Sequence, residues 1–168
     1  MKLTIINEGR NKGNLIIDDA RIIYRNLSGE PSQYNREGDR NFSLVIPDQD
    51  VANALIDEGW NVKIRAPREE GDMPFMHLPI KARFNDYGPT VYLRSGKNMV
   101  KLDEESVGQL DHIDIEFVDM EVRPYDWSRP DGSSGRSAYL ASMCVTQKVD
   151  RYMARYAEEE APEELPFD

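Results

Sequence analysis

The sequence predicts a single domain that is mostly β. Its 168 residues correspond to about one domain at the usual size of roughly 150 residues. Several short runs alternate apolar with polar residues, which is the pattern of half-buried strands. Gly, Pro, Asn and Ser gather between these runs and mark turns. We therefore expect about seven or eight strands and two or three short helices in one domain over residues 1–157.

Four strands, one loop and one helix are expected in the first half of the chain. Residues 26–39 are rich in turn formers and predict the loop. Asp48 is suited to be the N-cap of a short amphipathic helix, and Gly59 is placed to end it. The Asp18-Asp19 pair indicates a bend or bulge inside the first strand. The expected strands cover residues 14–25, 40–46, 60–66 and 77–84.

The second half of the chain predicts a hairpin, two further strands and two short helices. Ser95-Gly96 marks the turn of the hairpin. Asp103 is suited to cap a short helix that ends at Leu110. A phase shift in the alternation at Val118-Asp119 indicates a β-bulge. We expect hairpin strands over 90–94 and 97–102, later strands over 112–122 and 136–147, a Pro/Gly/Ser-rich loop over 124–136, and a short helix over 149–157.

A small β domain with a short helix between early strands fits an elaborated OB-fold-like barrel. An immunoglobulin-like sandwich or a jelly roll is the alternative, because periodicity does not fix the order of the strands. No run approaches the roughly 18 apolar residues of a membrane span, and the N-terminus has no apolar signal region. A protein of the cytoplasm is therefore expected. Cys144 is the only cysteine, and His77 and His112 are the only histidines, so no disulfide and no metal site of the usual kind is expected.

The charge of the chain is unevenly placed. The net charge is −10, from 31 acidic and 21 basic residues. The last eleven residues, 158–168, hold six of the acidic residues and no basic one, so residues 1–157 carry −4. A Glu/Pro-rich segment this polar buries too little surface to fold alone, which predicts a disordered acidic tail. Such a tail can dock in a basic pocket of another protein, compete with nucleic acid for a basic groove of its own chain, or simply aid solubility.

Two predicted strands carry pairs of cations opposite their apolar residues. Lys63 and Arg65 are two residues apart, and so are Lys81 and Arg83, so each pair projects to one side of the sheet. If the strands are neighbours, the four cations line one surface that suits a phosphate backbone. A solvated outer face with scattered salt bridges is the alternative.

Aromatic residues stand next to cations in the predicted loops. Bases stack on exposed rings at about 1–3 kcal/mol each. Trp127, in the Pro/Gly/Ser-rich loop, and Tyr34 are the better stacking candidates. Trp60 follows the helix-ending glycine and is more typical of a core residue.

Acidic residues give the main enzymatic alternative. Asp111, Asp114, Glu116 and Asp119 fall on or next to one predicted strand, and a two-metal nuclease needs several converging carboxylates. Their alternation with Ile113, Ile115 and Phe117 is more typical of a solvated strand face. The sequence has no phosphate-binding glycine loop and no zinc-protease motif. We therefore expect no catalytic activity, no cofactor and no metal.

These residues together resemble a known family. The stretches 19–26, 40–42, 59–63 and 122–127 are similar to single-stranded DNA-binding proteins of bacteria and, more closely, of their phages. The similarity touches most of residues 15–147 in short pieces, and the acidic tail adds to it. In that family an OB domain binds single strands without sequence preference, and the tail recruits replication or recombination proteins. Here Asp168 follows Phe167, whereas the family tail usually ends in Phe itself. This departure fits a phage-encoded partner, or mimicry of the terminal carboxylate by the Asp168 side chain.

The resemblance implies a non-enzymatic single-stranded DNA-binding protein of phage or prophage replication or recombination. Such a protein acts in the cytoplasm of the bacterial host, and the sequence does not decide between a monomer and a homodimer. A β-rich protein-interaction or virion module and the metal-dependent nuclease are the alternatives. The expected DNA-binding residues are Arg25, Tyr34, Arg40, Trp60, Lys63, Arg65, Lys81, Arg83, Tyr92, Arg94 and Trp127. The residues of the tail that match the family's partner-binding segment are Glu158, Glu159, Glu160, Glu163, Glu164, Pro166 and Phe167.

Overall fold

The computed structural model describes residues 1–149, and these residues confirm a mostly-β domain. The helix expected up to residue 157 and the tail expected over 158–168 lie beyond them, outside the described residues. The described part has ten strands, one α-helix and one 3-10 helix. These elements are β1 (Lys2–Ile5), β2 (Leu15–Ala20), β3 (Ile22–Asn26), β4 (Arg40–Val45), α1 (Gln49–Asp57), β5 (Lys63–Arg65), β6 (Phe75–Ala82), β7 (Thr90–Ser95), β8 (Asn98–Leu102), η1 (Val107–Asp111), β9 (Ile115–Ser128) and β10 (Ser134–Gln147).

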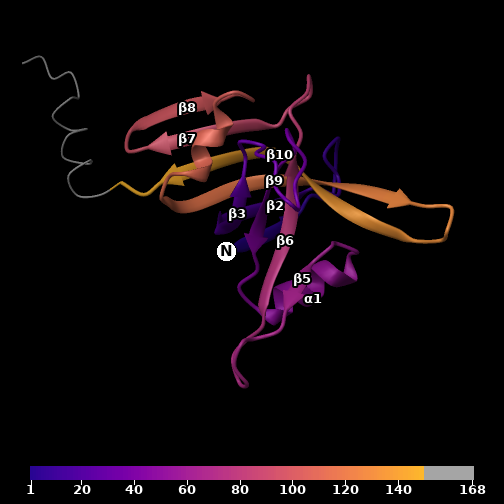
Figure 1. The fold of residues 1–168 in the computed structure, drawn as a ribbon. Coiled ribbons are helices and arrows are strands. Elements are labelled where there is room, and N and C mark those ends of the chain that lie inside the picture. The colour runs from indigo at the N-terminus through magenta and orange to yellow at the C-terminus, as the bar shows by residue number, and fades with distance from the viewer. Residues whose placement is uncertain (150–168) are drawn as a thin grey trace, which may run out of the picture.

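The strands are ordered as in an OB-type barrel (Figure 1). The sheet runs β1-β2-β9-β10-β6-β4-β3, and only the pairings of β10 with β6 and with β7 are parallel. β2 and β3 follow one another in the chain, yet β2 pairs with β9 and β3 pairs with β4. One bent segment therefore joins the two ends of the sheet, which gives the five-stranded Greek-key barrel of the OB fold. β1, α1, β5 and the β7–β8 hairpin are additions to it.

The bend in this segment lies where the sequence predicts it. Asp19 has a φ of +54°, and the register of β2 against β9 shifts between Ile17 and Ala20. The backbone N–H of Asp19 donates to Oδ1 of Asp119 over 2.8 Å. The direction of the chain thus changes at the Asp18-Asp19 pair, and β3, which follows it, pairs with β4.

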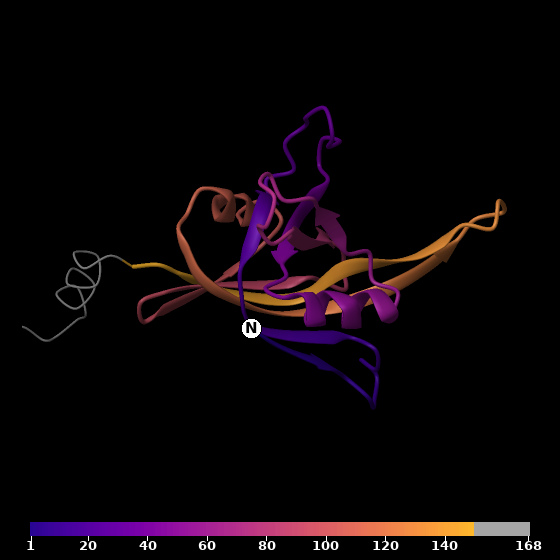
Figure 2. The same ribbon diagram turned by 90° about the horizontal axis from the view of Figure 1, so that it is seen from below.

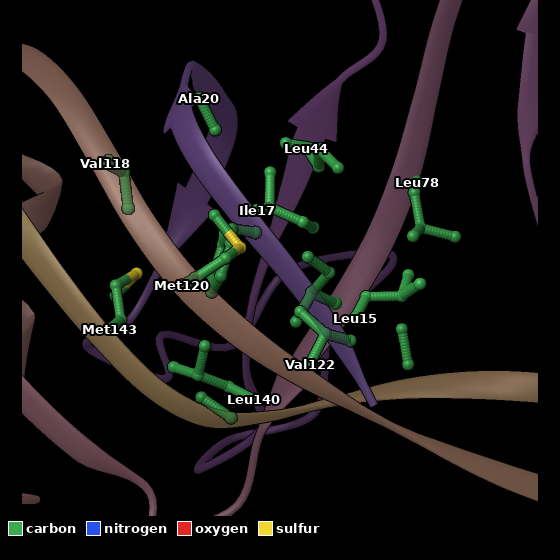
Figure 3. Close-up of a cluster of buried hydrophobic side chains, with 14 of the residues drawn as sticks. Leu15, Ile17, Ala20, Leu44, Leu78, Val118, Met120, Val122, Leu140 and Met143 are labelled. Carbon is green, nitrogen blue, oxygen red and sulfur yellow. The ribbon is translucent and has the colours of Figure 1, made fainter. Parts of the chain in front are cut away.

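The core fills the barrel with the apolar residues of each alternating strand. On β6, Leu78, Ile80 and Ala82 are buried while the intervening residues reach the surface. Figure 3 shows Leu15 and Ile17 of β2 packed among side chains of β9 and β10. Each large side chain buried in this way contributes about 1.5–3 kcal/mol of transfer free energy. The core therefore fixes which face of each strand points outward.

The helix begins and ends as predicted. Oδ1 of Asp48 accepts the N–H of Val51 over 2.8 Å, which caps the N-terminus of α1. Gly59 has a φ of +92°, a conformation that glycine adopts without strain, and it ends the helix. Ala52 and Leu55 are the residues that α1 buries.

Several predicted boundaries are wrong. The stretch 124–136 is not a loop: β9 continues to Ser128 and β10 begins at Ser134, so the two strands form a long hairpin that extends away from the barrel (Figures 1 and 2). Past Val122, β9 pairs with β10 but no longer with β2, so Pro124 sits at a free edge where no N–H is needed. The bulge expected at Val118-Asp119 lies at Glu116, which the register of β9 against β10 skips.

Two other elements are shorter than expected. The strand predicted over 60–66 is reduced to β5, and Ile64 is 51% exposed instead of facing the core. β5 pairs with β6 but with no second strand, so nothing covers this side chain. The helix predicted from Asp103 is one 3-10 turn that starts at Val107, because Asp103 accepts the N–H of Ser106 and closes a separate turn before it.

Candidate nucleic-acid interface

Four neighbouring strands place one residue each in a row on the outside of the barrel. Asn41 of β4 is opposite Lys81 of β6. Lys81 is opposite Tyr139 of β10, which is in turn opposite Arg123 of β9. Cross-strand partners share a face, and each residue of the row has a buried neighbour on its strand, so the row points outward; these neighbours are Phe42, Ala82, Leu140 and Val122. It contains two cations, one amide and one aromatic ring, and no carboxylate.

Aromatic rings and cations meet closely around this row. Nζ of Lys81 lies 5.8 Å from the centre of the Tyr139 ring. The Tyr125 ring packs edge-on against Tyr139 with 5.9 Å between centroids, and Tyr125 remains 59% exposed. We refer to Lys81, Arg123, Tyr125 and Tyr139 as the central cluster. It offers stacking surface and positive charge at one place.

A basic pocket of about 320 Å³ adjoins the central cluster at the ends of β4 and β6. Arg36, Lys81 and Arg83 line it and are exposed. Arg40 lines it as well, but its Nη1 pairs with Oε1 of Glu104 over 3.3 Å. The ion pairs found within residues 1–149 involve Arg40 and Arg136 alone, which leaves the other three cations of the pocket available to an anionic ligand.

A second aromatic group lies toward the opposite end of β6. Phe75 and His77 stack with 5.4 Å between ring centroids, and Tyr24 of β3 packs edge-on against both. Lys63 is opposite His77 and Arg65 is opposite Phe75 across the β5–β6 pair, so both cations share this face. We refer to Tyr24, Phe75 and His77 as the second cluster.

The surroundings of His77 favour the neutral form of its ring by lowering its pKa. Partial burial lowers the pKa of its imidazole below the usual value, and the positive charges of Arg65 and Lys63 lower that pKa further. Its Nδ1 lies 3.0 Å from Oγ of Ser43. A neutral ring in this position can stack on its neighbours, and a nearby anion would favour its protonation.

The four cations predicted from the strand faces do share one outward face. They do not form one patch, however. Phe75, opposite Arg65, and Lys81 are six residues apart on β6, which corresponds to about 20 Å along the strand. One pair therefore belongs to the second cluster and the other pair to the basic pocket.

Three of the predicted DNA-binding residues have structural partners instead. Nη1 of Arg25 donates to the carbonyls of Leu110 and Ile113 over 2.6 and 2.8 Å, which ties β3 to η1. Trp60 is only 4% exposed, so its ring offers no face to a base. Arg40 is held by Glu104, and its side chain is 16% exposed.

The remaining predicted residues lie at three different places. Tyr34 is 91% exposed on the loop between β3 and β4. Trp127 is half-buried on the β9–β10 hairpin, in the same alternation phase as Arg123 and Tyr125. Tyr92 and Arg94 lie on β7, and Tyr92 shares a groove with Asp18, Asp119 and Glu121, where phosphate would be repelled.

Sequence reasoning missed most of the aromatic part of the surface. Tyr139 stands between the buried Ala138 and Leu140, so strict alternation marks it as an outward ring. Phe75 precedes the predicted start of its strand and carries no such signal. Arg36 and Arg123 were visible as cations, but only the register shows which rings they lie near.

Two of the four carboxylates of the nuclease alternative, Asp111 and Asp119, accept hydrogen bonds that hold the fold together, and Asp114 and Glu116 are exposed. Asp111 accepts the N–H groups of Leu27 and Ser28 over 2.8 and 3.0 Å, and the hydroxyl of Ser28 over 2.8 Å. Asp119 accepts the N–H of Asp19. In residues 1–149, no three acidic, histidine or cysteine side chains are grouped so that they could hold a metal ion. Nor does this part of the chain have a helix of the length and apolar character that crossing a membrane requires.

An OB-type barrel with rings and cations on its outer strands is the architecture of a single-strand nucleic-acid-binding domain. Comparison with known families agrees. A family model described as "Putative phage ssDNA-binding domain" matches residues 7–165. The chain therefore belongs to this family of phage single-stranded DNA-binding domains.

One solved structure shows the same overall fold, and two others are less similar. A C-terminally truncated single-stranded DNA-binding protein from bacteriophage Enc34 aligns over 89% of this chain and 97% of its own, with 15% identity and a TM-score of 0.54. The protein from the same phage without truncation gives 15% identity over 89% and 92% of the two chains, with a TM-score of 0.47. The single-stranded DNA-binding protein gp2.5 of bacteriophage T7 gives 10% identity over 89% and 98%, with a TM-score of 0.40. No curated protein sequence matches the chain.

Proposed function

We propose that this protein binds single-stranded DNA, without sequence preference, on the outer face of β4, β6, β10 and β9. The observation that carries the proposal is the central cluster, where Lys81 and Arg123 lie beside Tyr125 and Tyr139 on one outward face. Cations take the phosphates and rings take the bases, which is how sequence-tolerant single-strand binding works. Membership of the phage family supports this assignment.

The rings favour a single strand over a duplex. In a duplex the faces of the bases are stacked on one another, so the phosphates and base edges are open to contact but the faces are not. A single strand can use both the cations of the basic pocket and the rings of the central cluster. Stacking accepts every base, because each has a π-face, so no sequence preference follows.

The basic pocket gives the sharpest test of this assignment. Lys81→Ala with Arg83→Ala removes two exposed cations that line it. If both contact phosphates, the slope of log affinity on log salt becomes shallower by about 1.4, at about 0.7 per contact for single strands. Fluorescence anisotropy of a labelled 30-mer oligo-dT measures that slope.

A matched control uses two cations from the β7–β8 hairpin. Lys97→Ala with Lys101→Ala removes the same charge from exposed positions away from the central cluster. This pair should leave the slope close to that of the wild type. Equal effects of both double variants would mean that net charge, and not this face, governs binding.

We propose further that the acidic segment 158–168 recruits replication or recombination proteins of the phage, in the cytoplasm of its host. The segment combines a run of glutamates with Pro166 and Phe167 close to its end. Deleting it should keep or raise affinity for oligo-dT, because a competing negative charge is removed. The deletion should also abolish co-purification of replication proteins from phage-infected cells. Lower DNA affinity after deletion would contradict this role.

A further inference from the structure

Tyr24 adopts a backbone conformation that is costly for its residue type. Its φ is +55°, in the left-handed region that bulky side chains rarely enter. Such strain costs on the order of 1–3 kcal/mol and persists only where the surrounding structure imposes it. It collects at functional sites, so the position calls for a physical explanation.

A β-bulge explains where the Tyr24 ring goes. Ile23 is opposite Ser43 and Asn26 is opposite Asn41, so β3 has one more residue than β4 between these two pairs. Regular alternation after Ile23 would turn Tyr24 toward the inside of the barrel. The bulge instead leaves its ring 48% exposed, 6.2 Å from the centre of Phe75 and 5.5 Å from that of His77. Bulges redirect side chains in this way next to binding sites.

The ring that the bulge exposes borders a basic pocket. A pocket of about 360 Å³ is lined by Tyr24, Phe75, Arg65, Arg68 and Met73, among others. Arg65 and Arg68 are exposed, and neither takes part in an ion pair within residues 1–149. Asp72 is the one acidic side chain in the lining. The pocket thus has aromatic and apolar walls with two cations beside them.

We infer that the second cluster, together with Arg65 and Arg68, is a separate base-binding subsite for single-stranded DNA. This inference rests on the proposed function. One base enters the pocket beside Tyr24 and Phe75, and the arginines hold its flanking phosphates. The subsite lies about 20 Å along β6 from the central cluster, so one extended strand of several nucleotides can reach both. Ser43 and Pro79 lie between the two and provide neither an aromatic ring nor a charge.

Tyr24→Gly separates the structural role of this residue from its binding role. Glycine adopts a positive φ without strain, and this relief offsets the ring contacts that are lost, so the melting temperature should stay close to that of the wild type. The stacking ring is lost, so affinity for 30-mer oligo-dT should fall about fivefold or more. Tyr24→Phe keeps the ring and should keep the affinity. Tyr92→Ala removes an exposed tyrosine from β7 and serves as the control that should change nothing.

Photocrosslinking of the wild-type protein gives a second measurement that needs no variant. Oligo-dT carrying 5-iododeoxyuridine should crosslink to Tyr24, Phe75 or His77 as well as to rings of the central cluster. Unchanged affinity of folded Tyr24→Gly, together with crosslinks confined to the central cluster, would overturn the subsite and leave the proposed function intact. Failure of the wild type to bind oligo-dT would overturn both.

Discussion

Nζ of Lys81 and the ring of Tyr139, 5.8 Å apart, stand opposite one another where β6 and β10 run parallel. This parallel pairing brings together residues that are 58 positions apart in the chain. A phosphate on the lysine and a base on the tyrosine can therefore be held at the same point of the barrel. The pair lies at the centre of the proposed interface, between the basic pocket and Tyr125.

Tyr139→Leu should weaken oligo-dT binding without changing its salt dependence. The variant keeps a large apolar side chain but removes a stacking face, which costs about 1–3 kcal/mol of binding free energy. Because no charge is lost, plots of log affinity against log salt should be parallel for variant and wild type. Anisotropy titrations at four or more salt concentrations check this. A changed slope with the same affinity at low salt would contradict the stacking role.

Gly135→Ala should displace the indole of Trp127. A Cβ on Gly135 would fall 2.6 Å from Cζ2 of Trp127, its cross-strand partner, which is too close for the ring to stay in place. The guanidinium of Arg129 lies 5.0 Å from the centre of the same ring. We expect a loss of about 1–3 kcal/mol in the free energy of unfolding and a shift of the tryptophan emission. Ser137→Ala on the same hairpin is the control.

Trp127 also serves as a probe of DNA contact on the hairpin. If its ring stacks on a base, Trp127→Ala should weaken oligo-dT binding by about 1–3 kcal/mol. Trp60 is buried and should remain a constant background in the emission spectrum. Quenching of the wild-type emission by oligo-dT reports the contact. Full affinity in a folded Trp127→Ala variant would remove this residue from the interface.

Asp111→Asn should destabilise the domain. Both carboxylate oxygens accept hydrogen bonds, from the N–H groups of Leu27 and Ser28 and from the Ser28 hydroxyl. The asparagine amide would place an N–H group against one of these donors, at a cost of about 1–3 kcal/mol. Urea unfolding measures the loss, and Asp114→Asn, at an exposed position, should leave stability unchanged. Equal stability of the two variants would contradict this role.

His77 should make stability and DNA binding depend on pH in opposite directions. Its pKa is lowered in the folded protein by burial and by Arg65 and Lys63, so the unfolded chain binds the proton more readily. The free energy of unfolding should therefore fall as the pH drops below about 6.5, and less so in His77→Gln. DNA phosphates favour the protonated ring, so oligo-dT should raise its pKa. In a His112→Gln background His77 is the sole histidine, and NMR can follow its titration with and without DNA. An unchanged pKa would place the strand away from the second cluster.

The parts of the fold that depend on local sequence were predictable. Alternation on β6 identified Leu78 and Ile80 as core residues and Lys81 as an outward cation. Asp48 and Gly59 marked the ends of α1 because capping is a local property. A basic surface suited to phosphates was predicted from the same patterns, because cations that alternate with apolar residues can be recognised on one strand without knowing its neighbours.

The site itself depends on which strands lie side by side, and that is not a local property. The Pro/Gly/Ser content of 124–136 is typical of a loop, but cross-strand pairing and the fit of Trp127 on Gly135 extend it as a hairpin. A bulge in β3 turns the Tyr24 ring toward Phe75 and His77, and no residue pattern in the sequence predicts this bulge. Trp60 and Arg25 were plausible DNA contacts until their partners in the core and in η1 were known.

Anisotropy of the wild-type protein with labelled 30-mer oligo-dT and with a matching duplex, at low and high salt and with EDTA present, tests the central claim most directly. The account predicts tight binding to the single strand alone, with a slope of log affinity on log salt of about −3 to −4 for four to six phosphate contacts. The absence of binding at low salt, or equal binding to the duplex, would contradict it.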